Sequence, residues 1–167
     1  MKLVKLDPTD LRILRELQQD GSITNVALSK KVGISPPPCL RRVRALEEAG
    51  YIRGYYADIA SDKMGFGITV FTMVSLTNHG ENDITHFSKL IEGWPQVREA
   101  YLMTGDTDFL LKIVAEDWEA FQKFLTSQIV GAPNVAHVKS MPAMHRVKYA
   151  PGVPIHMPED KGQAQEK

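Results

Sequence analysis

The chain has 167 residues, which is enough for one domain or two small ones, and its 20 Lys+Arg residues balance its 20 Asp+Glu residues. No apolar run approaches the roughly 18 residues that a membrane-spanning helix needs, and the first residues lack a signal-peptide pattern. The single cysteine, Cys39, cannot form an intrachain disulfide, so the expected location is the reducing cytoplasm.

The charges divide unevenly along the chain. Residues 1–60 carry 10 Lys+Arg against 7 Asp+Glu, whereas residues 61–167 carry 10 against 13. A basic first part fits a polyanionic partner, and an acidic second part does not.

The first two predicted helices are short. The Asp-Pro pair at residues 7–8 is typical of a helix start and Gly21 of a helix end, which places the first helix between them. Either Thr24 or Asn25 caps a second helix, which ends at Gly33. The residues that this second helix is expected to bury are Ala27, Leu28 and Val32.

A third helix is predicted from the cap Ser35 to the terminator Gly50. Prolines at 36–38 occupy its first three positions, where backbone N–H groups have no acceptor inside the helix. The predicted inward stripe is Leu40, Val43 and Leu46. The residues predicted to point the other way are Pro38, Arg41, Arg42 and Ala45.

The second and third helices form a helix-turn-helix around the turn at residues 33–35. A helix with one apolar and one cationic face, held by a short turn against a partner helix, suits the major groove of DNA. The predicted DNA-binding residues are Ser35, Pro37, Pro38, Arg41, Arg42, Arg44 and Ala45, with Lys30 and Lys31 beside the phosphate backbone.

These residues have alternative interpretations. Arg41 faces outward, toward a base edge or a phosphate, whereas Arg42 lies nearer the apolar stripe. For Arg42 the alternatives are an ion pair within the domain and a phosphate contact. Lys30 and Lys31 could equally be ordinary surface residues.

The rest of the chain predicts a second domain. Residues 51–57 are expected to form a strand and residues 58–65 a linker. Alternating and amphipathic patterns then predict strands at 66–76, 97–103, 109–114 and 135–147, a helix at 83–91, and a helix capped by Asp117. The order βαββαβ is that of a ferredoxin-like sandwich.

The predicted fold class is therefore α+β. A winged-type helix-turn-helix domain (residues 1–57) precedes a ferredoxin-like βαββαβ domain (residues 66–150) for effector binding and oligomerisation. Residues 151–167, rich in Pro, Gly and charge, are expected to be a mobile tail.

Asp106 and Asp108 are the pair that invites an enzymatic interpretation. They lie on a tight turn, however, where aspartates usually bond their own backbone. No catalytic triad, nucleophile elbow or P-loop accompanies them, and the five histidines have no metal-ligand spacing. We expect no enzyme activity, no metal and no cofactor.

Four motifs occur in a characteristic order. They are Leu6-Asp7 with Ile13-Leu14 and Leu17, the turn Gly33-Ile34-Ser35, Arg42-Val43 with Leu46-Glu47 and Gly50-Tyr51-Ile52, and Gly105-Asp106-Thr107-Asp108-Phe109. Together they resemble the Lrp/AsnC family of leucine- and asparagine-responsive transcription regulators, over roughly residues 5–150. The resemblance implies a C-terminal domain that dimerises, dimers that often assemble into octamers, and an amino acid bound between dimers near the turn joining the second and third strands.

The expected effector-binding residues are Tyr101, Leu102, Thr104, Gly105, Asp106, Asp108 and Met141. Gly105 allows close approach of the backbone, whose N–H groups hold a carboxylate, and Asp106 holds an ammonium. Tyr101, Leu102 and Met141 would then select the effector side chain.

The predicted function is a sequence-specific, homo-oligomeric regulator of transcription that binds double-stranded DNA and responds to an amino acid or a related small molecule. One alternative is an effector-independent architectural DNA-binding protein of the same fold, because phosphate contacts dominate affinity whatever the sequence. Another alternative is a metabolite-binding domain or enzyme that retains a vestigial DNA module.

Overall fold

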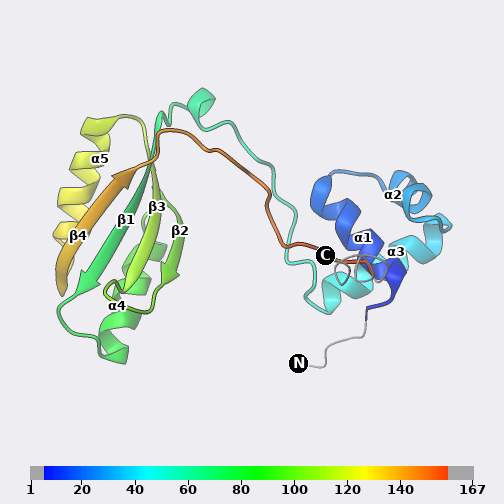
Figure 1. The fold of residues 1–167 in the computed structure, drawn as a ribbon, viewed down its shortest axis with the longest axis horizontal. Helices are drawn as coiled ribbons and strands as arrows, with labels where there is room; N and C mark the ends of the chain where they lie inside the picture. The colour runs from blue at the N-terminus through cyan, green and yellow to red at the C-terminus, as the bar shows by residue number, and fades with distance from the viewer. Residues whose placement is uncertain (1–5, 158–167) are drawn as a thin grey trace, which may run out of the picture. The chain divides into compact units, whose positions relative to one another are not determined.

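The computed structural model describes residues 6–157, which form two compact units (Figure 1). The first unit contains the described residues up to Asp58 together with the segment that begins at Lys148, and the second unit is Ile59–Val147. None of the helices in residues 6–157 is long and apolar enough to cross a membrane.

The first unit is a three-helix domain of α1 (Pro8–Gln19), α2 (Asn25–Val32) and α3 (Pro36–Glu48). Gly33 ends α2 in the left-handed conformation, with φ of 76°, which a residue without Cβ adopts at little cost. The helices enclose one core, made of Ile13, Leu28, Val32, Cys39 and Leu46. The predicted helix-turn-helix is confirmed.

The start of α3 follows from its three prolines. Ser35 is the N-cap residue, but its side chain makes no capping hydrogen bond. The reason is that the residues at the second and third helical positions, Pro37 and Pro38, have no N–H to donate. The first N–H of the helix is that of Cys39, which donates to the Ser35 carbonyl at 3.2 Å.

The predicted inward stripe of α3 is wrong at one position. Leu40 is 40% exposed, whereas Cys39 is fully buried. An α-helix has 3.6 residues per turn, so a step of three residues falls about 60° short of a full turn. Leu40 and Leu46 are two such steps apart and therefore cannot share a narrow face. Cys39 and Leu46, seven residues apart, do share one, and they form the buried stripe.

Two smaller predictions also fail. Ala27 is exposed, and Ser29 takes the buried position, where its hydroxyl donates to the Val26 carbonyl at 2.9 Å. The predicted strand at residues 51–57 is absent, because an extended segment becomes a strand only when it pairs with a neighbour. The predicted linker at 58–65 contains a single 3₁₀ turn, η1 (Asp62–Met64).

The second unit is an antiparallel four-stranded sheet with two helices (Figure 1). Its elements in chain order are β1 (Ile68–Leu76), α4 (Glu81–Glu92), β2 (Val97–Leu102), β3 (Phe109–Ala115), α5 (Trp118–Phe124) with a π-helical continuation η2 (Leu125–Val130), and β4 (Val135–Pro142). The strand order is β2-β3-β1-β4. The predicted βαββαβ arrangement is therefore confirmed.

One face of this sheet carries the core. Alternate residues of β1 and β3 are buried, as expected for a sheet with helices on one side only. Phe87 of α4 anchors this layer, with ring centroids 4.9 Å from Phe109 and 5.8 Å from Trp94. The other face of the sheet has no covering element among the described residues.

The C-terminal segment contacts α1. The Gln18 amide donates to the Val153 carbonyl at 2.8 Å and accepts from the Val153 N–H at 3.1 Å. Gly152 lies so close that a Cβ there would clash with Gln18 Oε1. Within the predicted mobile tail, Gly152 and Val153 thus take part in a contact with α1, and residues 158–167 lie outside the described residues.

Leu40 and Leu46 differ in exposure, so truncating each to alanine should lower the free energy of unfolding by different amounts. Leu46→Ala should destabilise the first unit by about 2–5 kcal/mol, because it opens a cavity in the core. Leu40→Ala should cost less than about 1 kcal/mol, because the side chain is already partly in water. Amide hydrogen exchange of α1–α3 in the full chain measures both, and equal losses of protection would contradict the assigned helix face.

Candidate DNA-binding and effector sites

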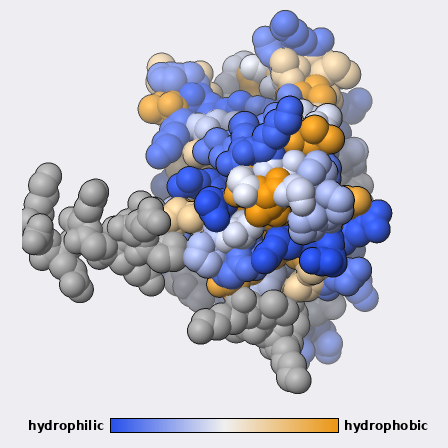
Figure 2. All heavy atoms as spheres, turned by 90° about the vertical axis from the view of Figure 1, so that its right-hand side faces the viewer, coloured by the Kyte–Doolittle hydropathy of each residue, from blue (hydrophilic) through white to orange (hydrophobic). Residues whose placement is uncertain are grey.

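The outer face of α3 combines apolar and cationic side chains around a shallow hollow. Its residues are Pro37, Leu40, Arg41, Arg44, Ala45 and Glu48. Arg41 and Arg44 are exposed and make no ion pair with any residue between 6 and 157. On the side of the molecule shown in Figure 2, small hydrophobic patches lie among hydrophilic side chains.

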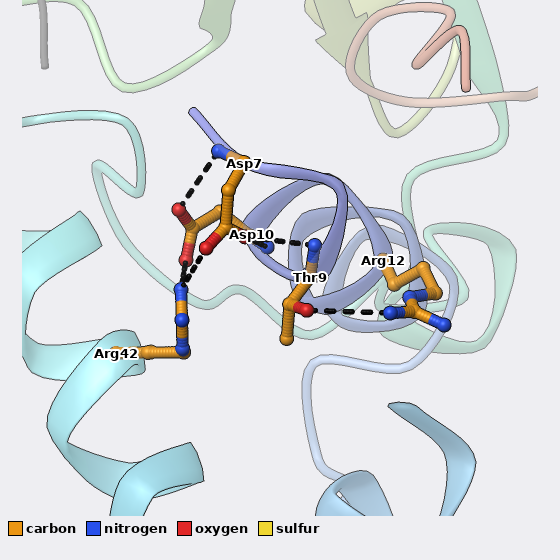
Figure 3. Close-up of polar contacts among 5 residues, drawn as sticks. All are labelled: Asp7, Thr9, Asp10, Arg12 and Arg42. Atoms are coloured by element: carbon orange, nitrogen blue, oxygen red, sulfur yellow. Dashed lines mark hydrogen bonds and ion pairs between the residues drawn. The ribbon is translucent and has the colours of Figure 1, made fainter. Parts of the chain in front are cut away.

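Arg42 points to the other side and joins α3 to the start of α1 (Figure 3). Its Nη1 atom lies 2.7 Å from Asp7 Oδ2 and 2.7 Å from Asp10 Oδ1. Of the two interpretations of Arg42, this geometry favours the ion pair within the domain over a phosphate contact.

The two aspartates that bind Arg42 also cap α1. The N–H groups of Thr9 and Asp10 both donate to Asp7 Oδ1 at 2.8 Å, and the Asp7 N–H donates to Asp10 Oδ2 at 3.1 Å. This reciprocal pattern satisfies N–H groups that have no partner inside the helix. The hydrogen bond from the Asp10 N–H, together with the Arg42 guanidinium, lowers the pKa of Asp7 below its ordinary value of 3.8, although desolvation opposes the shift.

Two contacts fix α2 against its neighbours. The Asn25 amide donates to the Pro36 carbonyl at 2.9 Å, which ties the start of α2 to the start of α3. Lys31 pairs with Glu16 of α1 at 2.8 Å, and this contact raises the pKa of the Lys31 ammonium. Lys30 is exposed beside it, so of the two predicted phosphate contacts only Lys30 is uncommitted to an ion pair within the described residues.

The predicted effector loop follows β2, and hydrogen bonds within the second unit hold its backbone in place. The Leu76 N–H donates to Asp108 Oδ2 at 2.7 Å, and His79 Nε2 lies 3.3 Å from the same oxygen. The Met103 N–H donates to the Asp108 carbonyl at 2.8 Å. The Asp108 side chain therefore binds the backbone at the end of β1, whereas its carbonyl closes the β2–β3 turn.

The exposed part of the loop lies beside this framework. Gly105 adopts a φ of 112°, which residues with a side chain rarely adopt. Thr104 and Asp106 are exposed, and so are Tyr101 and Leu102 at the end of β2. Six of the seven predicted effector residues are thus neighbours along the chain, at the β2–β3 turn and the strand end before it.

Met141 is the exception. It lies on β4, at the opposite edge of the sheet from β2. Three strand spacings, roughly 14 Å, separate these edges. A single chain therefore does not bring Met141 to the loop.

Sequence reasoning missed two residues of the outer α3 face, Leu40 and Glu48. The signal was available, because Pro37, Arg41, Arg44 and Glu48 follow each other at steps of three and four residues and mark one helix face. Among the described residues no group of His, Cys, Asp or Glu side chains could hold a metal ion.

A helix-turn-helix followed by a ferredoxin-like domain defines a DNA-binding regulator with a separate sensory domain. The family model "Winged helix-turn-helix DNA-binding" matches residues 6–53, and the model "Lrp/AsnC ligand binding domain" matches residues 69–153. The chain belongs to the Lrp/AsnC family of transcriptional regulators, as its motifs predict.

Named relatives agree with this assignment. A leucine-responsive regulatory protein of Rhizobium meliloti is 47% identical over 152 residues, 91% of this chain and 97% of that protein. The transcriptional regulator AzlB of Bacillus subtilis is 38% identical over the same shares of both chains. A regulator from Neisseria meningitidis, solved as a complex with L-Met, has a TM-score of 0.85 at 34% identity, over 90% of this chain and 97% of that one.

The lowered pKa of Asp7 predicts acid-sensitive stability of the first unit. A carboxyl with a lowered pKa stabilises the folded state while it is ionised, and this contribution is lost as pH falls through the folded-state pKa. We therefore expect stability to fall below about pH 3.8. Asp7→Asn keeps a capping acceptor but removes the charge, so its stability should depend less on pH in this range.

Urea unfolding of the full chain, followed by far-UV circular dichroism across the acid range, measures this difference. Asp62→Asn is the matched control, because Asp62 is an exposed aspartate of the second unit. An acid dependence of Asp7→Asn as steep as that of the wild type would assign the effect to other carboxyl groups.

Proposed function

We propose that this chain regulates transcription by placing the outer face of α3 in the major groove of specific DNA sites. The observation that carries this proposal is the pair of exposed guanidinium groups of Arg41 and Arg44, on the helix that follows the turn of a helix-turn-helix. Arginine is the residue that most often reads guanine, through two hydrogen bonds in the major groove. The protein acts by binding, without a catalytic step, in the cytoplasm.

The second unit supplies dimerisation in this proposal. The uncovered face of its sheet carries the half-buried or exposed apolar side chains of Phe71, Met73, Leu110, Val114, Tyr101 and Met141. A face of this kind is unfavourable in water and fits a second copy of itself across a two-fold axis. A dimer presents two α3 helices, which matches the two half-sites that helix-turn-helix proteins bind. Further assembly of dimers, up to octamers, is part of the same proposal.

The loop after β2 supplies the effector site. Relatives are named leucine-responsive, and the Neisseria regulator is a complex with L-Met, which supports an α-amino acid as the effector here. Backbone N–H groups around Gly105 suit the carboxylate, and the exposed Asp106 suits the ammonium. Met141, distant within one chain, would reach this site only from another copy.

The DNA proposal predicts a loss of affinity in Arg41→Ala. Specific binding should weaken by about 1–3 kcal/mol, because a base-reading or phosphate-binding guanidinium is removed. Fluorescence anisotropy at fixed salt, on a site selected from random DNA by the full-length wild type, measures the change.

Arg98→Ala is the control, since it removes an exposed guanidinium from the second unit. A loss below about 0.5 kcal/mol in Arg41→Ala would remove Arg41 from the interface. Equal wild-type affinity for selected and scrambled DNA would instead establish the architectural alternative.

The effector proposal predicts that Asp106→Ala no longer binds amino acids while its dimer still binds DNA. The ammonium of the effector loses its counter-charge, and a ligand can shift assembly only through its binding energy. Titration calorimetry with each standard amino acid at millimolar concentration measures binding, and Glu116→Ala, an exposed carboxylate in the same unit, is the control. Absence of binding by the wild type to every amino acid would refute this part of the proposal.

A further inference from the structure

The N-terminal end of α3 has an unusual chemistry for a helix that faces DNA. Pro36, Pro37 and Pro38 occupy the first three helical positions, so none of these positions has an N–H. The N–H groups that a helix start usually offers to phosphate or to base edges are absent there. Recognition at this end of α3 depends on side chains.

The side chains that this end exposes outward are apolar. Pro37 is exposed, and Leu40 one turn later is 40% exposed on the same hollow. Leu40 is not required by the core, which Cys39 and Leu46 occupy from the same helix. An exposed leucine next to two arginines is therefore a feature of the outer surface.

The major groove contains one apolar group that matches this surface. Each base pair presents hydrogen-bond donors and acceptors there, and only thymine adds a methyl group, at C5. Residues near the start of a recognition helix are those that contact base edges. Pro37 and Leu40, at this position, therefore have one apolar group to contact in the major groove, the thymine methyl.

We propose that Leu40, supported by Pro37, is a specificity-determining residue that recognises thymine through its C5-methyl group. This inference rests on the proposed function and names the base that the apolar end of α3 reads. Arg41 and Arg44, on the same face, supply the hydrogen-bond donors. The helix would thus contact a thymine methyl group through Leu40 and acceptor atoms of the DNA through its arginines.

A protein partner is the competing occupant of this surface, and the charges argue against it. Arg41 and Arg44 flank Leu40 and make no ion pair with described residues. DNA provides both the negative charge that pairs with these guanidinium groups and the thymine methyl group that contacts Leu40. The apolar area of one leucine and one proline is also small for a protein interface.

The experiment replaces thymine by deoxyuridine, one position at a time, in a site selected from random DNA by the full-length protein. Deoxyuridine keeps every hydrogen-bonding group of thymine and lacks only the methyl. At one or more positions per half-site the wild type should lose about fourfold in affinity, which corresponds to about 0.8 kcal/mol for one buried methyl-sized group.

Leu40→Ala should bind the thymine site more weakly, and deoxyuridine at the same position should then have little further effect. Leu40→Met keeps an apolar side chain and should keep the methyl dependence. Val130→Ala, which truncates an exposed aliphatic side chain of the second unit, should behave as the wild type.

Two results would overturn the inference while leaving the proposed function intact. One is specific binding by the wild type that no deoxyuridine substitution weakens, which requires no variant to fold. The other is an equal deoxyuridine effect in the wild type and in Leu40→Ala. Absence of any specific DNA binding by the wild type would instead refute the proposed function itself.

Discussion

The ion pairs of Arg42 with Asp7 and Asp10 fix which side of α3 faces outward, and the proposed DNA contact depends on that orientation. One guanidinium nitrogen lies 2.7 Å from each carboxylate, so α3 cannot rotate without breaking both contacts at the start of α1. Burial of Cys39 and Leu46 on the same side reinforces this rotation. With these contacts made, successive residues at about 100° per step bring Arg41 and Arg44 to the outside. Of the three arginines at positions 41, 42 and 44, one therefore forms ion pairs within the domain and two lie on the outer face of α3.

A similar division occurs at the turn after β2. The Asp108 side chain accepts from the Leu76 N–H at the end of β1, and the Asp108 carbonyl accepts from the Met103 N–H, so these groups tie the turn to β1 and close it. Two residues away, the exposed Asp106 side chain accepts no hydrogen bond from any residue between 6 and 157, and only the Asp106 carbonyl takes part, by accepting from the Ser75 hydroxyl. A ligand site needs exposed groups on a rigid support. On this turn Asp108 supplies the rigid support, and Asp106 supplies the exposed carboxylate.

Local signals allowed most of the fold to be predicted from the sequence. The Asp7 cap and Gly33 act through neighbouring backbone groups, so their effects are visible in a few residues. Properties that depend on distant partners were harder to predict. The expected strand at 51–57 has no neighbour to pair with. The grouping of Met141 with the β2–β3 turn overlooked that β2 and β4 form opposite edges of the sheet. For Arg42 the sequence left an ion pair open as an alternative, but only the folded positions of two carboxylates favour it.

The prolines of α3 connect local geometry with recognition. A helix start that offers N–H groups binds any phosphate, and this contact fixes position without reading sequence. Since Pro36, Pro37 and Pro38 remove these donors, the start of α3 gains no sequence-independent affinity from its backbone. The Ser35 hydroxyl is also left without a capping role, because no N–H lies within its reach. What remains outward at this end is apolar surface, which gains free energy only by excluding water from another apolar group. In a groove lined with polar base edges, that requirement is itself a form of selectivity.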